Sequence, residues 1–393
     1  MENPGESRPL VSLMCSHWRS QATDERDIIY ALAGLASDCQ VPALSIDYSV
    51  PTWTVYLQTL AFLLQNTGSL DMIAYSGIGH QPLGRPTWAP SFYCPDGSGP
   101  ALTDSQKLFN ATGVHPFTAS KGVQARARFL ASHRLFDKPL GIDRTILQVE
   151  GCRVDTISQQ LLYRGKNTSL KGRQLGSLKL GLGRNALRKY RISSSNWMRS
   201  KHRRHALDII KILYLIVVET PCPGHIDGEQ ATPEERLEEL WRTLTYERTP
   251  GGQVAPEEWS QAISVLINGP SVVPTNFEPA PSISNFSNAN RAISFTRPLL
   301  GAIENLFSGD AWLFMSKTGR LGIANRNARI NDFVYVIPGC NMPVVVRKDK
   351  PARQDDIFNG TLHGSAYIHH YMYGKAIEDL NAGKLGVMTL NLK

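Results

Sequence analysis

The sequence predicts an α+β protein, with mainly helical N-terminal and middle regions and a small C-terminal antiparallel β module that is barrel-like. Apolar residues recur at helical spacing in two runs, one after residue 23 and one after residue 232. After residue 310, short β-rich runs alternate with Gly and Asn turns, which is typical of a small, bent sheet or barrel. The 393 residues, 42% hydrophobic and 19% charged, are enough for two or three compact units.

The first helical run lies in the stretch TDERDIIYALAGLA. Thr23 is placed to cap the helix N-terminus, and the acidic residues after it suit the positive end of the helix dipole. Ile28, Leu32 and Leu35 then share one face, which we expect to be buried. A second helix is expected to begin near Thr52.

The best-marked helix is ATPEERLEELWRTL. Thr232 is its predicted N-cap, Pro233 takes the first helical position, and Glu235 completes a capping box. Upstream of it, LQVEGCRVDTI predicts a strand, a turn at Gly151 and a second short extended piece. The apolar run ILYLIVV is far shorter than the ~20 residues of a membrane span, and is read as a buried strand or helix core.

Positive charge is concentrated in one segment. From Thr156 to Leu207 the chain carries 13 of its 42 Lys and Arg residues and no acid, which leaves 29 basic against 34 acidic residues elsewhere. Five glycines interrupt this segment, so it is expected to be a flexible insertion. The expected organisation is a disordered N-terminus (1–19), a helical region with short strands (20–160), the basic insertion (161–205), a helical region ending in a Pro/Ser/Asn-rich loop (206–305), the β module (308–375) and a tail (376–393).

Six short elements, in order from Ala22 to Gly374, resemble the region that follows the HET domain in fungal heterokaryon-incompatibility (HET) proteins. They are ATDERDIIYALAGLA with IDYS behind it, the Trp-x-Pro element, VEGCRVDTI, LWRTL, TGRLGIANRNARINDFVYVIPGCNMPVVVRK and LHGSAYIHHYMYG. Each element is short, and the resemblance rests on their order along the chain.

The chain also departs from the family pattern. Asn331 stands where the family has glycine before Asp332, His370 replaces a glycine, and Phe92 replaces a second tryptophan. The eponymous HET domain would lie upstream and carry the signatures A-L-S-Y-x-W-G and W-I-D-x-x-C-I-N-Q. Its absence leads to the expectation that Met1 begins after that domain.

The resemblance implies a role in non-self recognition and programmed cell death, with the death-inducing part in the HET domain. The chain is therefore expected to be a non-catalytic regulatory or scaffold region. Arg26 and Asp27 form either a functional ion pair or a structural unit, in which Asp27 lies at the helix start and Arg26 holds a neighbouring loop or the missing upstream domain. The residues that the resemblance marks as structural are Arg26, Asp27, Tyr30, Asp47, Tyr48, Trp88, Pro90, Gly151, Asp155, Trp241, Asp332, Gly339, Pro343, Arg347, Tyr367, His369 and Gly374.

Catalytic and metal signatures are missing from the sequence. It has no G-x-S-x-G elbow, P-loop, H-E-x-x-H or G-x-G-x-x-G, so neither an enzymatic activity nor a cofactor is expected. His363, His369 and His370 lie close together, but neighbouring residues on a strand point to opposite faces, so no metal site is expected. An exposed face around Arg347 and Tyr367 is a candidate contact surface of the β module, for a protein partner or for the missing HET domain.

An alternative function is binding of nucleic acid or an anionic surface through residues 162–205. Cations with interleaved aromatic residues can neutralise phosphates and stack on bases. Six cysteines without a C-x-x-C pair, and an N-terminus without an apolar leader, favour a cytoplasmic protein, or a nuclear one through RSKHRRH. The candidate binding residues are Arg184, Arg188, Lys189, Tyr190, Arg191, Trp197, Arg199, Lys201, Arg203 and Arg204.

Overall fold

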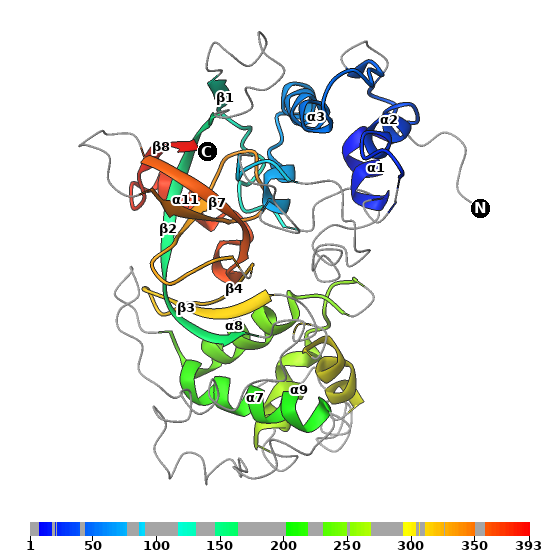
Figure 1. The fold of residues 1–393 in the computed structure, drawn as a ribbon. Helices are drawn as coiled ribbons and strands as arrows, with labels where there is room; N and C mark the ends of the chain where they lie inside the picture. The colour runs from blue at the N-terminus through cyan, green and yellow to red at the C-terminus, as the bar shows by residue number, and fades with distance from the viewer. Residues whose placement is uncertain are drawn as a thin grey trace, which may run out of the picture. The chain divides into compact units, whose positions relative to one another are not determined.

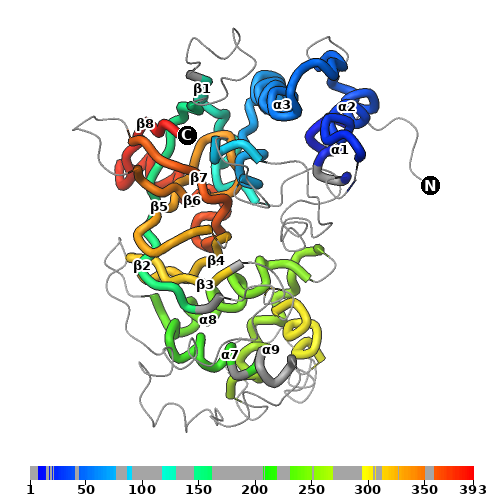
Figure 2. Tube along the Cα trace, viewed as in Figure 1, coloured from blue at the N-terminus to red at the C-terminus, as the bar shows by residue number. Residues whose placement is uncertain are grey.

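The structure is a computed structural model of the chain, shown in Figures 1 and 2. It describes residues 8–17, 20, 22–39, 44–76, 86–90, 117–130, 146–163, 202–218, 231–249, 252–268, 294–303, 306, 311–325, 327–349 and 358–393. The chain divides into two compact units. Unit 1 comprises Met1–Ile157 and Asn327–Lys393, and unit 2 comprises Ser158–Arg326.

The N-terminal part of unit 1 is helical. Helix α2 begins at Asp27, three residues later than expected, and Arg26 takes the N-cap position in place of Thr23. The helix ends at Ala33, so Leu35 lies beyond it and is 72% exposed, contrary to its expected burial. Residues 10–17 are helical, where a disordered N-terminus was expected. The helices of this part are α1 (Leu10–His17), α2 (Asp27–Ala33), α3 (Thr52–Thr67) and the 3₁₀ helix η2 (Asp71–Tyr75).

In the described part of unit 1, six strands form its sheet. They are β1 (Ala127–Leu130), the first part of β2 (Ile146–Tyr163), β5 (Phe333–Val336), β6 (Val344–Lys348), β7 (Phe358–Tyr367) and β8 (Val387–Leu392). The strand β2 pairs with β5, β5 with β6, β6 with β7, β7 with β8, and β8 again with β2, so the pairing returns to its starting strand. Every pairing is antiparallel except β7–β8, and β1 adds to β2 as a further antiparallel strand.

The core of unit 1 lies on one face of these strands, because directly paired residues share a face. Val149 pairs with Leu390 and Tyr335 pairs with Val344, and all four side chains are buried. The ring of Phe358 lies 5.6 Å from that of Tyr335. Burial raises the pKa of the Tyr335 hydroxyl to about 12, and this hydroxyl donates to the sulfur of Met388. The sheet therefore surrounds an aliphatic and aromatic core.

Two sequence expectations fail in this sheet for identifiable reasons. The strand β2 runs unbroken through Gly151, because this glycine leaves room for the side chains of Leu390 and Ile337 and does not turn the chain. The expected tail, 376–393, belongs to the fold. It supplies β8 together with most of helix α11 (Lys375–Asn381).

A turn between β5 and β6 holds the helical part against the sheet. Gly339 has a φ of 81°, and a Cβ at this position would lie 2.6 Å from the Cβ of Ala125. The Asp71 carboxylate accepts from the backbone N–H of Asn341 at 2.6 Å and from its side-chain amide at 3.0 Å. Position 339 of the turn therefore requires glycine, because any side chain there would collide with Ala125.

The described part of unit 2 combines helices with a strand pair. The capping box of α8 is present as expected, with Thr232 and Glu235 bonding to each other's backbone N–H. The indole rings of Trp241 and Trp259, both fully buried, meet edge to face at 6.3 Å. Its elements are α7 (His202–Val217), α8 (Pro233–Thr245), α9 (Glu258–Asn268), the helical residues 294–303, β3 (Ala311–Ser316), β4 (Leu321–Asn325) and the end of β2.

The strand pair β3–β4 is built around a glycine. Gly322 is directly paired with Phe314, whose fully buried ring covers it. The ring occupies the space that a Cβ at position 322 would need, since that atom would lie 2.3 Å from Cζ of Phe314. An aromatic ring over a strand glycine replaces the packing that the glycine lacks.

The prediction of an α+β fold with an antiparallel sheet is confirmed. The division into units differs from the expected one. The strands of the expected β module (308–375) are divided, with β3 and β4 in unit 2 and β5 to β7 in unit 1. The apolar run ILYLIVV lies in helix α7. None of the helices in the described ranges is long and apolar enough to cross a membrane.

Candidate functional site

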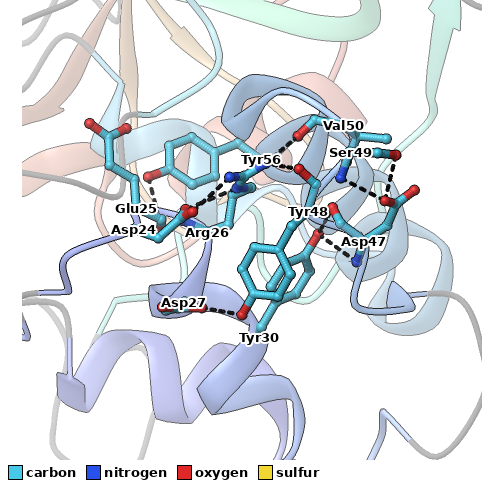
Figure 3. A network of polar contacts seen from close by, with 10 residues as sticks. All are labelled: Asp24, Glu25, Arg26, Asp27, Tyr30, Asp47, Tyr48, Ser49, Val50 and Tyr56. Carbon is cyan, nitrogen blue, oxygen red and sulfur yellow. Dashed lines mark hydrogen bonds and ion pairs between the residues drawn. The ribbon is translucent and has the colours of Figure 1, made fainter.

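The most heavily bonded group of resemblance residues surrounds Arg26 at the start of α2 (Figure 3). Its guanidinium binds the Asp24 carboxylate through Nε at 2.9 Å and Nη2 at 2.6 Å. Its Nη1 donates to the carbonyl oxygens of Tyr48 at 2.6 Å and Val50 at 2.8 Å. Arg26 therefore holds the connector between α2 and α3, and we call this group the Arg26 clamp.

The same connector is fastened from α2 at two further points. The Tyr30 hydroxyl donates to the carbonyl of Asp47 at 2.9 Å and accepts from its N–H at 3.2 Å. The Tyr48 hydroxyl donates to the Asp27 carboxylate at 2.5 Å. Asp47 itself closes a local turn by accepting from the N–H and hydroxyl of Ser49. Five resemblance residues, Arg26, Asp27, Tyr30, Asp47 and Tyr48, thus meet at one place.

The electrostatics of the clamp follow from these bonds. Hydrogen bonds from the Arg26 side chain and backbone lower the pKa of the Asp24 carboxyl to about 2. The hydrogen bond to Asp24 raises the pKa of Arg26, and the bond to Asp27 raises the pKa of the Tyr48 hydroxyl. The Arg26–Asp24 ion pair therefore stays charged, and the Tyr48 phenol stays neutral, throughout the physiological range of pH.

We expect Arg26→Lys to loosen the connector although the positive charge is kept. An ammonium cannot reproduce the planar fork that binds Asp24 while a further N–H group reaches two carbonyl oxygens. Hydrogen exchange of residues 44–50 should become faster, and limited proteolysis should cut the connector sooner. Arg126→Lys, at an arginine that is 80% exposed, is the matched control and should change neither rate.

A second ionic group lies on the sheet of unit 1. Arg347 forms a two-point bond with Asp332, through Nε and Nη2 at 2.8 Å each, and Nη2 also donates to the carbonyl of Asn327 at 2.7 Å. The Asp332 side chain is only 3% exposed and also accepts from the N–H of Arg329. Asn331, just before it, has a φ of 72°. This left-handed conformation suits glycine or asparagine, which gives a physical reason for Asn331 where the resemblance has glycine.

His363 lies beside this ion pair on β7. Burial is the main cause that lowers the pKa of its imidazole to about 4, and the positive charges of Arg347 and Arg329 add to it against the opposing effect of Asp332. The ring contacts the hydroxyl of Thr361 at 3.0 Å. The folded chain therefore holds a neutral histidine.

This lowered pKa makes stability depend on pH. Because the ordinary pKa of histidine is about 6.5, the unfolded chain binds a proton between pH 6.5 and 4 that the folded chain does not. We expect the urea midpoint of unit 1 to fall as the pH is lowered through this window. His363→Gln should flatten the dependence, and an unchanged slope in this variant would contradict the assignment.

The other resemblance residues lie in packed or bonded positions. Trp88 and Tyr367 are 1% exposed, with their rings against Phe129 and Phe117, and the Trp241 indole donates to Glu238. Pro90 is buried, Asp155 accepts from the N–H of Thr156, and the Pro343 carbonyl accepts from Ala366. Gly374, with a φ of 86°, lies against Lys121 at the start of α11.

Two sequence expectations about the β module are wrong. Tyr367 is buried and Arg347 is bonded to Asp332, so the proposed exposed face around these two residues does not exist. His369 and His370 lie in the 3₁₀ helix η4 (His369–Tyr371), so the strand argument against their sharing a metal ion fails. Within the described residues, no group of three or more His, Cys, Asp or Glu could hold a metal ion.

Most of the candidate basic site lies outside the described residues. This applies to Arg184, Arg188, Lys189, Tyr190, Arg191, Trp197, Arg199 and Lys201. Arg203 and Arg204 belong to the first turn of α7, and residues 161–163 complete β2, so both ends of the expected insertion are regular structure.

Sequence reasoning missed a row of polar side chains that crosses four strands of unit 1. Arg128 Nε donates to Gln148 Oε1 at 2.5 Å, Gln148 Nε2 to Asn391 Oδ1 at 2.8 Å, and Asn391 Nδ2 to Asn359 Oδ1 at 3.2 Å. We call Arg128, Gln148, Asn391 and Asn359 the amide row. Each strand contributes one polar residue to the row, and their alignment depends on the register of β1, β2, β8 and β7.

Comparison with known proteins adds no identification. The chain matches no protein-family model, no curated protein and no solved structure.

Proposed function

We propose that the chain is the non-catalytic regulatory or scaffold region of a fungal protein of the HET family, acting in the cytoplasm in non-self recognition and programmed cell death. Its role in this proposal is to bind and restrain a HET domain, in the same polypeptide or in a partner. In this proposal the closed circuit of strands in unit 1 presents the helical part of that unit in a fixed orientation.

One observation supports this proposal best: the residues that carry the resemblance are occupied by bonds within the chain. Arg26 binds two backbone carbonyl groups, and Asp332 binds Arg347. Trp88, Trp241 and Tyr367 are fully buried. Residues held in this way maintain a shape, which is what a scaffold requires, whereas a catalytic group must be available to a substrate.

The proposal is tested first on the gene and then in cells. The genomic DNA and transcript upstream of the Met1 codon are read for an in-frame segment with the two HET signatures. Where such a segment is present, the whole product is induced in a fungal host, with and without residues 22–374, and growth arrest is recorded. Where stop codons lie there, this chain is co-expressed with a separately supplied HET domain, and viability is compared with the HET domain alone.

Restraint predicts that the chain delays or reduces the growth arrest caused by the HET domain. Asp332→Ala, which is expected to damage the fold of unit 1, should lose this effect and serves as the control. The proposal fails if viability is unchanged in the experiment that applies, either deletion of residues 22–374 from the whole product or co-expression of the chain with a HET domain.

A second candidate function is binding of nucleic acid, favoured by the charge distribution. A segment with 13 cations and no acid, in a chain whose remainder is net negative, is an electrostatic footprint for phosphates. The logarithm of the binding constant for a labelled single-stranded nucleic acid should fall linearly with the logarithm of the salt concentration. Replacing Arg199, Lys201, Arg203 and Arg204 by Gln should reduce that slope by about 0.7 per lost contact, and an unchanged slope would count against this function.

A further inference from the structure

Strand β1 forms an edge of the sheet in unit 1. Within the described residues it pairs only with β2, in the register Ala127↔Val149 to Leu130↔Ile146. The N–H of Glu150 donates to the carbonyl of Arg126, which makes Arg126–Glu150 a hydrogen-bonded pair. In an antiparallel ladder such pairs alternate, so the backbone N–H and C=O of Ala127 and Phe129 point away from β2. This edge is a template for one more strand.

The edge carries two arginines on one face. Arg126 bonds to Glu150 and Arg128 to Gln148, which shows that both side chains lie on the same side of the sheet. The Arg126 side chain is 80% exposed, and its bond to Glu150 is long, at 3.4 Å. Arg128 is exposed as well. Exposed pairs of this kind contribute little, so Arg126 can exchange its partner at small cost.

The amide row fixes the direction of the Arg128 guanidinium. Its Nε is committed to Gln148, which is held in turn by Asn391 and then by Asn359. No Nη group of Arg128 bonds to a described residue. A guanidinium held by Nε presents its two Nη groups as a ready fork for a carboxylate, with little further loss of side-chain freedom.

We propose that the β1 edge binds an acidic, extended peptide of a partner protein by strand addition. The backbone of the peptide bonds to the outward N–H and C=O groups of Ala127 and Phe129. Acidic side chains at alternate positions of the peptide lie opposite Arg126 and Arg128, where cross-strand neighbours are about 5 Å apart. The opposite charges select an acidic sequence over the basic or neutral ones that an uncharged edge would also accept.

The test uses the full chain and a fluorescein-labelled peptide in which Glu and Val alternate, followed by fluorescence anisotropy. Arg128→Glu should weaken binding about tenfold or more. Ala127→Pro should abolish it, because proline at the first residue of an edge strand removes an outward N–H and none of the bonds to β2. Circular dichroism checks that both variants stay folded. Peptide addition should also slow hydrogen exchange at Ala127 and Phe129 in the unaltered chain.

Two controls separate this site from general attraction by the basic segment. A peptide with Lys in place of Glu should not bind. Replacing Arg199, Lys201, Arg203 and Arg204 by Gln should leave binding of the acidic peptide unchanged. The proposal is overturned if binding survives Ala127→Pro but is lost in the Gln variant, or if the acidic peptide neither binds saturably nor protects the amides of β1.

Discussion

Asp332→Ala should lower the free energy of unfolding of unit 1 by about 3–5 kcal/mol, the largest effect expected of any substitution considered for this chain. The Asp332 side chain is 3% exposed and holds both the Arg347 guanidinium and the N–H of Arg329. Its removal leaves a half-buried positive charge and a backbone donor without their acceptor. Because a chain with two units need not unfold in one step, the effect is best measured by urea-dependent hydrogen exchange of β5 and β6.

The matched control is Asp349→Ala, which breaks a pair with the ammonium of Lys393 at 2.8 Å. Both side chains of that pair are at least 32% exposed, so the expected cost is below about 1 kcal/mol. A further variant, Asp332→Asn, keeps the shape but loses the charge and should lie between the two. Equal costs for Asp332→Ala and Asp349→Ala would show that the buried pair is not what stabilises this turn.

Gly322→Ala should destabilise unit 2 by about 2–3 kcal/mol, the cost of overpacking a filled core. The added Cβ would lie 2.3 Å from Cζ and 2.7 Å from Cε1 of Phe314, whose ring is fully buried. Hydrogen exchange of β3 and β4 reports the change, because these two strands pair through this residue.

A double-mutant cycle tests the cause. Phe314→Leu removes the ring, so Gly322→Ala should cost less in that background, with a coupling of about 1 kcal/mol or more. Gly301→Ala is the opposite control. It lies in the helical stretch 294–303 with no atom within 4 Å of an added Cβ, and should stabilise the chain by about 0.5–1 kcal/mol. If the destabilisation by Gly322→Ala is the same with and without Phe314→Leu, the contact with the ring is not its cause.

The parts of the fold that were predictable are those fixed by local chemistry. The capping box at Thr232 and the helix that begins at Thr52 depend on neighbours within four residues, and both are present. The failures have distant causes. The sequence predicts a turn at Gly151. The glycine is instead explained by its close contact with Leu390, which lies 239 positions away along the chain. The C-terminal segment reads as a tail because neither partner of β8 adjoins it in sequence.

In the candidate site, too, local features were predictable from the sequence and long-range contacts were not. The expectation that Arg26 holds a neighbouring loop could be formed from the sequence, but the choice of the Tyr48 and Val50 carbonyl groups could not, since backbone acceptors leave no sequence signal. The sequence predicts an exposed face around Arg347 and Tyr367. Arg347 is instead bonded to Asp332, and the Tyr367 ring packs against Phe117, a residue 250 positions earlier in the chain.

The position of β8 also has a consequence for biosynthesis. Strand β2 is complete once residue 163 is made, but two of its pairing partners, β5 and β8, end at residues 336 and 392. Unit 2 is one continuous stretch made between them and can acquire its own structure on the ribosome. The core of unit 1 can close only after β8, which ends at residue 392, has left the ribosome. Until then an apolar strand edge is open, so nascent-chain chaperones are expected to act on β2.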